Sequence, residues 1–324
     1  MKNIWNKYKR EFVVLLATLV MAVVFTVLNS NFLNYNNFVT ILQQMVLNGV
    51  LAVGMMFTII TGGIDLLVGC TYAITGIIVA SCTVNYGMNP FLGILVGLVV
   101  GAVLGAFNGF LINKMKLQPF IATLGTMSLY RGLAYVISNS EWASAENLGT
   151  FKDFALGKVL GLNNVIWVMI IIYVIFFIVM KWTKVGRKVY AVGSNREAAA
   201  ISGISTKRID VLVYTVMGTL SGLCGALAVS IYASAQPNML YGKEMDVIAA
   251  CVIGGVSMQG GRGSVVGAFL GSLILAIIAK ALPLVGIESI AQNTVKGIII
   301  MAVIILNVLA QRAMDRSNLK GREM

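Results

Sequence analysis

The side chains best suited to binding a small molecule are four uncharged amides within long apolar segments. They are Gln43, Gln44, Asn48 and Asn108. An amide both donates and accepts hydrogen bonds, so it can pair with the hydroxyl groups of a neutral solute on a pathway through the protein. Gln44 and Asn48 are one i,i+4 step apart and therefore share a helix face. The alternative is that each amide forms a hydrogen bond between packed helices.

Two acidic residues, Asp65 and Asp246, stand where apolar segments begin. Asp65 ends the motif TGGID, and Asp246 follows YGKEM, which contains Glu244. An intramembrane carboxylate can couple transport to ions, whereas one at the start of a helix caps it and suits the helix dipole. We predict capping at both sites and assign both residues a structural or gating role. Two basic residues near the ends of apolar segments, Arg131 and Lys296, are expected to extend to the membrane surface.

Other kinds of chemistry are excluded by what the chain lacks. It has no histidine, which removes His-based catalysis, His-ligated metal or haem, and a histidine proton relay. The four cysteines form no CxxC pair and lie in apolar surroundings, where cysteine packs as a small hydrophobe. No GxxxxGK(S/T) motif is present, so the chain is not expected to hydrolyse nucleotides. We expect no catalytic residue, metal or cofactor, and an energy source supplied by a partner or an ion gradient.

The composition predicts the fold class. Only 11% of the 324 residues are charged and 58% are hydrophobic, whereas a soluble domain carries about 25% charged residues. Residues 12–64 contain no charge, and the next charged residue after Asp65 is Lys114. Because about 20 apolar residues span a bilayer, we predict an all-α polytopic integral membrane protein with a single transmembrane domain over residues 1–324.

Charges, prolines and Asn/Gly clusters divide the chain into ten predicted spans. They are 12–28, 40–61, 66–84, 91–112, 119–138, 162–180, 210–232, 245–258, 264–282 and 291–310. The eighth is short and opens at Asp246, which favours a broken or short helix there. Eight or nine spans are the alternative.

The distribution of basic residues predicts the orientation. With the N-terminus inside and ten alternating spans, 18 of the 24 basic residues fall in inner segments. The exceptions are Arg131, Lys152, Lys158, Lys243, Lys280 and Lys296. Short cytoplasmic loops are enriched in Lys and Arg, so both termini are predicted to be cytoplasmic, with 311–324 as a cytoplasmic tail. This placement in short loops also explains the net charge of +12 better than a nucleic-acid surface does.

Glycines recur at every fourth residue in two spans. The fourth span has Gly93, Gly97, Gly101, Gly105 and Gly109, and the ninth is associated with Gly263, Gly267 and Gly271. Residues at i and i+4 share a face, so each set forms a groove that another backbone can approach closely. We predict packing seams, with Gly97, Gly101 and Gly105 as structural or gating positions. The alternative is that they line a moving pathway.

The segment 181–208, KWTKVGRKVYAVGSNREAAAISGISTKR, is strongly basic and contains a short helix signal. Asn195 (or Ser194) suits an N-cap, helix formers follow from Arg196, and Gly203 suits the stop. A helix of two turns is unstable alone in water. It must therefore pack against the membrane surface or a partner.

Several motifs in order resemble the permease subunit of bacterial ABC importers for ribose and other simple sugars. They are ILQQMVLNGVLAVGM, TGGIDLLVG, LQPFIATLGTMSLYRG, GRKVYAVGSNREAAAISGIS, SAQPNMLYGKEMDVIAACVIGGVSMQGGRGSVVG and VKGIIIMAVI. The resemblance covers nearly the whole chain. It implies a multi-pass protein of the bacterial cytoplasmic (inner) membrane, with a second permease copy in a homodimer, a cytoplasmic ATPase that binds ATP and Mg, and an extracytoplasmic sugar-binding protein.

The resemblance also assigns roles to residues of the segment 181–208. It places a coupling helix that docks in a groove of the ATPase at or beside Arg187, Asn195, Glu197, Ala198, Ala199 and Gly203. The expected function is a monosaccharide permease driven by a separate ATPase, with the choice of sugar made mainly by the binding protein. The alternatives are a gradient-driven secondary transporter of a small neutral solute and a passive channel.

Overall fold

The computed structural model describes residues 2–30, 32–144, 149–288, 291–302 and 305. The helices are α1 (Lys2–Leu28), α2 (Tyr35–Ile60), α3 (Val68–Tyr86), α4 (Pro90–Met115), α5 (Pro119–Ile137), α6 (Gly149–Leu156), α7 (Asn164–Trp182), α8 (Lys184–Ser194), α9 (Arg196–Ile201), α10 (Thr206–Tyr232), α11 (Glu244–Ile253) and α12 (Val265–Leu284). Two short antiparallel pairs join β1 (Ala143–Ser144) to β4 (Ser234–Ala235) and β2 (Lys158–Val159) to β3 (Leu162–Asn163).

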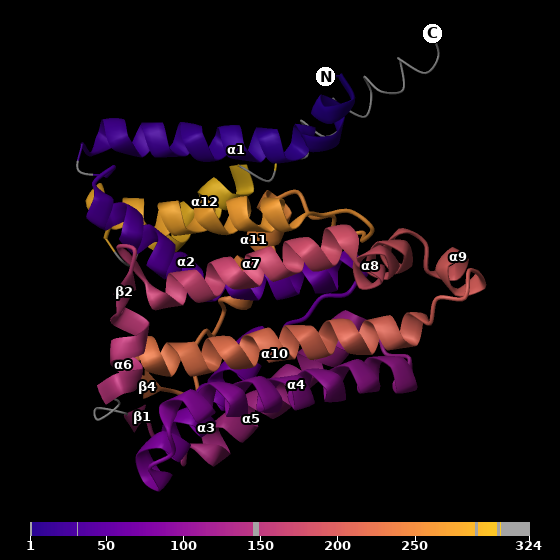
Figure 1. Ribbon diagram of the computed structural model, residues 1–324, viewed down its shortest axis with the longest axis horizontal. Helices are drawn as coiled ribbons and strands as arrows, with labels where there is room; N and C mark the ends of the chain where they lie inside the picture. Colours follow the sequence, from indigo (N-terminus) through magenta and orange to yellow (C-terminus); the bar gives the residue numbers. More distant parts are fainter. Residues whose placement is uncertain (1, 31, 145–148, 289–290, 303–304, 306–324) are drawn as a thin grey trace.

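The long helices lie side by side along one direction (Figure 1). Helices α8 and α9 lie at one end of this bundle, here called the α9 end, and the strands lie at the opposite end, the strand end (Figure 1). This is the arrangement expected of a membrane protein, because helices satisfy their backbone hydrogen bonds internally and can cross lipid.

Seven of the described helices are long and apolar enough to cross a membrane: α1, α2, α4, α5, α7, α10 and α12. The apolar stretch of α3, Val68–Thr83, is shorter. The predicted short eighth span is confirmed, because α11 has only 10 residues. The total of ten spans is not confirmed. Residues 291–302 are helical, but the whole predicted tail 311–324 and part of the last predicted span lie outside the described residues.

Helices α2, α10 and α12 form the centre of the bundle. In each of their membrane-crossing windows, two thirds or more of the residues are buried, at 67%, 67% and 72%. The corresponding share of α1 is 17%, so α1 lies at the periphery, where it packs along α12 (Figure 1). The Asn29 side chain, just after α1, donates to the carbonyl of Leu284 at 2.8 Å and ties the two helices together.

The closest helix contact joins α4 to α10 through glycines. A Cβ atom on Gly97 would lie 2.8 Å from the carbonyl oxygen of Gly222, and one on Gly101 would overlap the carbonyl oxygen of Gly218. Gly105 meets the Tyr214 backbone in the same way. The predicted packing seam on α4 is therefore confirmed. Its partner seam, Gly218 and Gly222 on α10, was not among the predicted residues, although the two are four positions apart in the sequence.

The second predicted seam is also a packing surface. A Cβ on Gly267 would overlap the carbonyl oxygen of Gly254, and one on Gly271 would overlap that of Ala250. These contacts hold α12 directly against α11 and the turn that follows it. Small residues allow such close backbone approach inside membranes.

We predict that Gly101→Ala destabilises the protein whereas Gly125→Ala does not. The methyl group at position 101 would force α4 away from α10, and overpacking of this kind costs about 1–3 kcal/mol. The apparent melting temperature in detergent should fall by about 3 °C or more. Gly125 is a matched control in α5, because nothing lies within 4 Å of a Cβ built there. Equal melting temperatures for the two variants would contradict the close contact.

Candidate functional site

The predicted coupling segment folds as two consecutive helices, α8 and α9. The side-chain oxygen of Asn195 accepts a hydrogen bond from the Ala198 N–H at 2.9 Å, so the expected N-cap of α9 is confirmed. Gly203 follows the helix with φ +78°, a left-handed conformation that favours glycine, as expected for the stop. Helix α8 was not predicted. It begins where the Thr183 hydroxyl accepts from the Gly186 N–H at 3.3 Å.

Helix α9 has one buried face and one open face. Ala199 is 4% exposed and packs inward. Glu197, Ala198 and Ala200 are exposed, and Ile201 is 88% exposed. The open face of α9 therefore ends in a large aliphatic side chain that the rest of the chain leaves uncovered.

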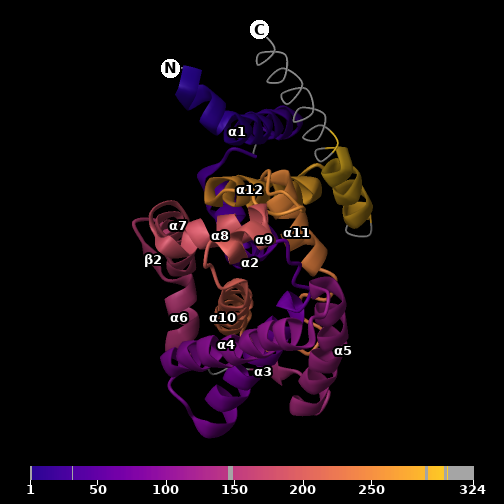
Figure 2. The ribbon, with the colours of Figure 1, turned by 90° about the vertical axis from the view of Figure 1, so that its right-hand side faces the viewer.

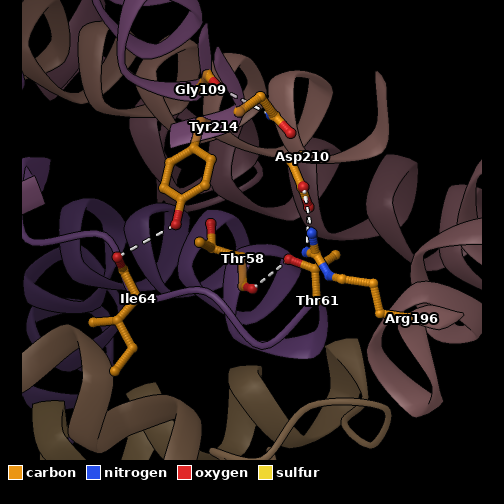
Figure 3. A network of polar contacts seen from close by, with 8 residues as sticks. Thr58, Thr61, Ile64, Gly109, Arg196, Asp210 and Tyr214 are labelled. Atoms are coloured by element: carbon orange, nitrogen blue, oxygen red, sulfur yellow. Dashed lines mark hydrogen bonds and ion pairs between the residues drawn. The ribbon is translucent and has the colours of Figure 1, made fainter. Parts of the chain in front are cut away.

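An arginine and an aspartate fasten α9 to α10. Arg196 Nη1 donates to Asp210 Oδ2 at 2.8 Å, and Nη2 donates to Oδ1 at 2.7 Å (Figure 3). This two-pronged geometry is the strongest that a guanidinium and a carboxylate form. The Asp210 side chain is 4% exposed, whereas that of Arg196 is 51% exposed. This pair was not predicted from the sequence. Arg196 and Asp210 lie on two separate helices with a turn between them, so no helical spacing relates their positions.

One turn further along α10, Tyr214 reaches the loop between α2 and α3. Its hydroxyl lies 3.5 Å from the carbonyl oxygen of Ile64, and the Thr61 hydroxyl donates to the Thr58 carbonyl at 2.8 Å (Figure 3). Gly63 leaves space for the Tyr214 hydroxyl, which would lie 2.6 Å from a Cβ there. The anchor of α9 and the loop 61–67 are thus linked through one face of α10.

Asp65 in this loop is buried and does not cap α3 as predicted. Its Oδ1 accepts from the Leu67 N–H at 2.8 Å, closing a turn before the helix. The N-cap residue is Leu67, which makes no side-chain cap. The prediction was wrong because two residues, Leu66 and Leu67, separate Asp65 from the start of α3 at Val68.

Three backbones meet beside the end of α8. The Gly261 N–H donates to the carbonyl oxygen of Ile60, the last residue of α2, at 2.8 Å. A Cβ on Gly193 would overlap the same Ile60 oxygen. The Tyr190 hydroxyl donates to the Gly263 carbonyl at 2.8 Å, and burial raises the pKa of Tyr190. We call Ile60, Gly193 and Gly261 the glycine junction. It connects α8 to α2 and to the segment that leads into α12.

A cavity of about 540 Å³ opens at the α9 end between these elements. Its lining includes Lys116, Asn195, Arg196, Lys207, Asp210 and Tyr214. Three of these side chains are cationic and one is anionic. Arg187, also in the predicted coupling segment, is exposed and donates through Nη1 to the Trp182 carbonyl at 3.3 Å.

The four predicted pathway amides do not gather at one place. On α2, Gln44 is exposed and Gln43 and Asn48 are half-buried. Asn108 is buried on α4 and accepts a hydrogen bond from the Thr126 hydroxyl of α5 at 3.1 Å. Asn108 therefore forms a hydrogen bond between two packed helices, which was the predicted alternative to a role in binding solute. A pathway role for these amides stays a prediction.

Asp246 is not a helix cap either. It lies in the first turn of α11, whose N-cap is Lys243 without a side-chain cap. Its Oδ2 accepts from Lys296 Nζ at 2.6 Å and lies 3.6 Å from Lys243 Nζ. Lys296 therefore does not extend to the membrane surface as predicted. The segment before α11 returns into the bundle, and this brings the Asp246 carboxylate to Lys296, 50 positions away in the sequence.

Arg131 also differs from its prediction. Instead of extending to the surface, it donates through Nη1 to the carbonyl oxygens of Pro237 at 2.6 Å and Met239 at 3.3 Å. Its Nη2 lies 3.7 Å from Glu244 Oε1. The same returning segment supplies all three partners.

Comparison with known proteins defines the class. Residues 37–308 match the family described as "Branched-chain amino acid transport system / permease component". The ribose import permease protein of Bacillus subtilis (strain 168) is 42% identical over 90% of this chain and 91% of its own length. The ribose import permease protein of Escherichia coli (strain K12) is 38% identical, over 90% and 92%. The L-arabinose transport system permease protein of the same strain is 36% identical, over 96% and 93%. No solved structure matches the chain.

The fold and these matches define a multi-pass permease of the bacterial cytoplasmic membrane. The chain belongs to the permease family that the comparison identifies, and its resemblance to the ribose-type permeases is confirmed.

We predict that Arg196 and Asp210 are energetically coupled. Arg196→Gln leaves the Asp210 carboxylate buried without its partner, which costs about 1–3 kcal/mol. Asp210→Asn should cost a similar amount, and the double variant less than the sum by about 1–2 kcal/mol. Thermal unfolding of the four proteins in detergent measures this. Additive losses would show that the pair does not hold α9 to α10.

Proposed function

We propose that this chain is the membrane-spanning subunit of an ATP-driven importer that carries a monosaccharide, ribose or a related simple sugar. The permeases named above for ribose and L-arabinose, 36–42% identical over nearly their full lengths, support this substrate class. A separate cytoplasmic ATPase binds ATP and Mg²⁺, and an extracytoplasmic binding protein delivers the sugar. The chain itself has no catalytic activity.

The observation that carries the proposal is the open face of α9. A helix of six residues is not stable by itself, and here one side is fixed by Ala199 and by the Arg196–Asp210 pair. The other side presents Glu197, Ala198 and the exposed Ile201. A short helix that is fastened to the bundle on one side and carries an exposed isoleucine on the other suits docking into a groove of the ATPase, which buries the isoleucine.

In this proposal the α9 end faces the cytoplasm and so do both termini. Lys116, Arg187, Lys207 and Arg208 all lie in segments at or next to this end, as the positive-inside rule requires. The pathway forms between two copies of the chain, because a symmetric pair is the common solution for identical subunits.

Closure of the ATPase moves α9, and the contacts at the α9 end carry that movement into the bundle. The Arg196–Asp210 pair transmits it to α10, and the glycine junction transmits it to α2 and α12. Coupling requires that the outward-open and inward-open states of the permease differ in affinity for the two ATPase states. Rigid contacts between packed backbones favour switching between two discrete arrangements over gradual bending.

We expect ribose uptake into vesicles only when the ATPase, ATP and the binding protein are all present. A gradient-driven transporter would accumulate ribose from the permease alone under an imposed proton or ion gradient. A passive channel would let ribose equilibrate in both directions without ATP. Radiolabelled ribose in vesicles containing the full complex, or the permease alone, distinguishes the three mechanisms, and uptake by the permease alone would contradict the proposal.

We predict that Ile201→Glu weakens binding of the ATPase without harming the permease. A charge in place of the exposed isoleucine removes the large apolar contact that the last residue of α9 offers to the ATPase. Recovery of the ATPase with the tagged permease in mild detergent should fall by about tenfold, which corresponds to about 1.4 kcal/mol. Leu160→Glu is the matched control, because Leu160 lies between β2 and β3 and is 85% exposed. Unchanged recovery with Ile201→Glu would exclude this face as the docking site.

A further inference from the structure

A largely buried arginine and a buried glutamate face each other inside the bundle without completing a hydrogen bond. Arg131 Nη2 and Glu244 Oε1 are 3.7 Å apart, and the two side chains are 12% and 4% exposed. Within the described part of the chain, Arg131 Nε, Arg131 Nη2 and Glu244 Oε1 have no hydrogen-bond partner. Burying charged groups while leaving their hydrogen-bonding capacity unused is costly, and inside a membrane such groups usually serve a function.

The pair lies near the middle of the bundle. The Tyr130 hydroxyl, next to Arg131 in the chain, donates to the carbonyl of Leu104, which is close to the centre of α4. The Gly69 backbone, in the first turn of α3, leaves room for the glutamate: a Cβ there would lie 2.5 Å from Glu244 Oε1. Helices α3, α5 and α11 therefore meet at these two side chains, far from both ends of α4.

Two helices start at this depth instead of at a membrane surface. Helix α3 begins after the loop 61–67, and the 10-residue α11 begins at Glu244 itself. The first N–H groups of a helix have no partner within the helix. Discontinuous helices whose ends meet near the midplane are characteristic of solute sites in transporters. Here Glu244 Oε1, on a side chain that is 4% exposed, has no hydrogen-bond partner among the described residues and is the independent sign of a ligand.

The cluster lies directly behind an open face of the chain. The Tyr241 ring covers the Arg131 guanidinium at 5.4 Å and is itself 70% exposed. Met245 is 58% exposed, and the Lys243 side chain is 47% exposed. Helices α5 and α11 lie along the same side of the molecule (Figure 2). Charged side chains are too costly to face lipid at this depth, so this face requires water or a second copy of the chain.

We propose that Arg131 and Glu244 form a hydrogen-bonding station for the hydroxyl groups of a neutral monosaccharide, on a water-filled pathway that Tyr241 and Met245 line. This inference rests on the proposed transport function and names the point of solute contact. The guanidinium supplies donors and the carboxylate supplies an acceptor, and each sugar hydroxyl can use either. Because the two charges cancel, the station suits a neutral solute better than an ion.

The first test is ribose uptake by vesicles containing the complete importer with Glu244→Gln. Losing the carboxylate should slow uptake about tenfold, equal to about 1.4 kcal/mol in the barrier. ATP hydrolysis stimulated by the ribose-loaded binding protein should stay near the wild-type rate, because the ATPase contacts are intact. Glu141→Gln, at an exposed position near the strand end, is the matched control and should leave both rates unchanged. Wild-type uptake by Glu244→Gln, or loss of uptake and ATP hydrolysis together, would overturn the proposal that Glu244 contacts the solute.

The second test needs no transport. In a Cys82→Ala background, which removes the half-buried cysteine and keeps the three buried ones, Met245→Cys should react rapidly with a charged, membrane-impermeant thiol reagent. Val23→Cys is the control: Val23 is 61% exposed on α1, and a cysteine there should react slowly. An unreactive Met245→Cys would overturn the water-filled pathway. If the wild-type importer carried no sugar at all, the proposed function would fail, while this labelling would still decide whether the face is hydrated.

Discussion

The rest of the structure depends on the contact between the backbones of α4 and α10. Gly97, Gly101 and Gly105 bring α4 against Gly218 and Gly222 so closely that a single methyl group would not fit. In a membrane, where lipid is as apolar as the helix surfaces, close packing replaces the hydrophobic effect as the force between helices. This contact fixes α10, and α10 carries the residues that anchor α9 and the loop 61–67.

Helix α10 thereby connects the α9 end with the interior. Asp210 holds Arg196, and Tyr214, one turn along, reaches the carbonyl of Ile64 (Figure 3). Glycine at positions 193 and 261 lets the end of α8 touch the end of α2. Short contacts thus link α9 to α10, to α2 and to the segment before α12, as the proposed coupling of an ATPase to the pathway requires.

Three of the predictions that failed have a common cause. Asp246, Arg131 and Lys296 were interpreted one at a time by their distance from the ends of predicted spans. The chain after β4 instead turns back into the bundle before α11 begins, and this places Glu244 and Asp246 beside those basic side chains. Hydropathy indicates which residues can lie in lipid. It does not indicate which side chains the first turn of a broken helix will contact.

The sequence by itself determined the helical membrane class, the glycine seam of α4, the short eighth span and the local form of α9. The membrane class follows from composition and the short eighth span from the position of Asp246, while the seam and α9 follow from periodicity and from capping between residues a few positions apart. Only the tertiary structure decided the Arg196–Asp210 anchor, the glycine junction and the pairing of Arg131 with Glu244. These contacts join residues from separate helices, and their geometry depends on how the helices pack, which no local pattern encodes.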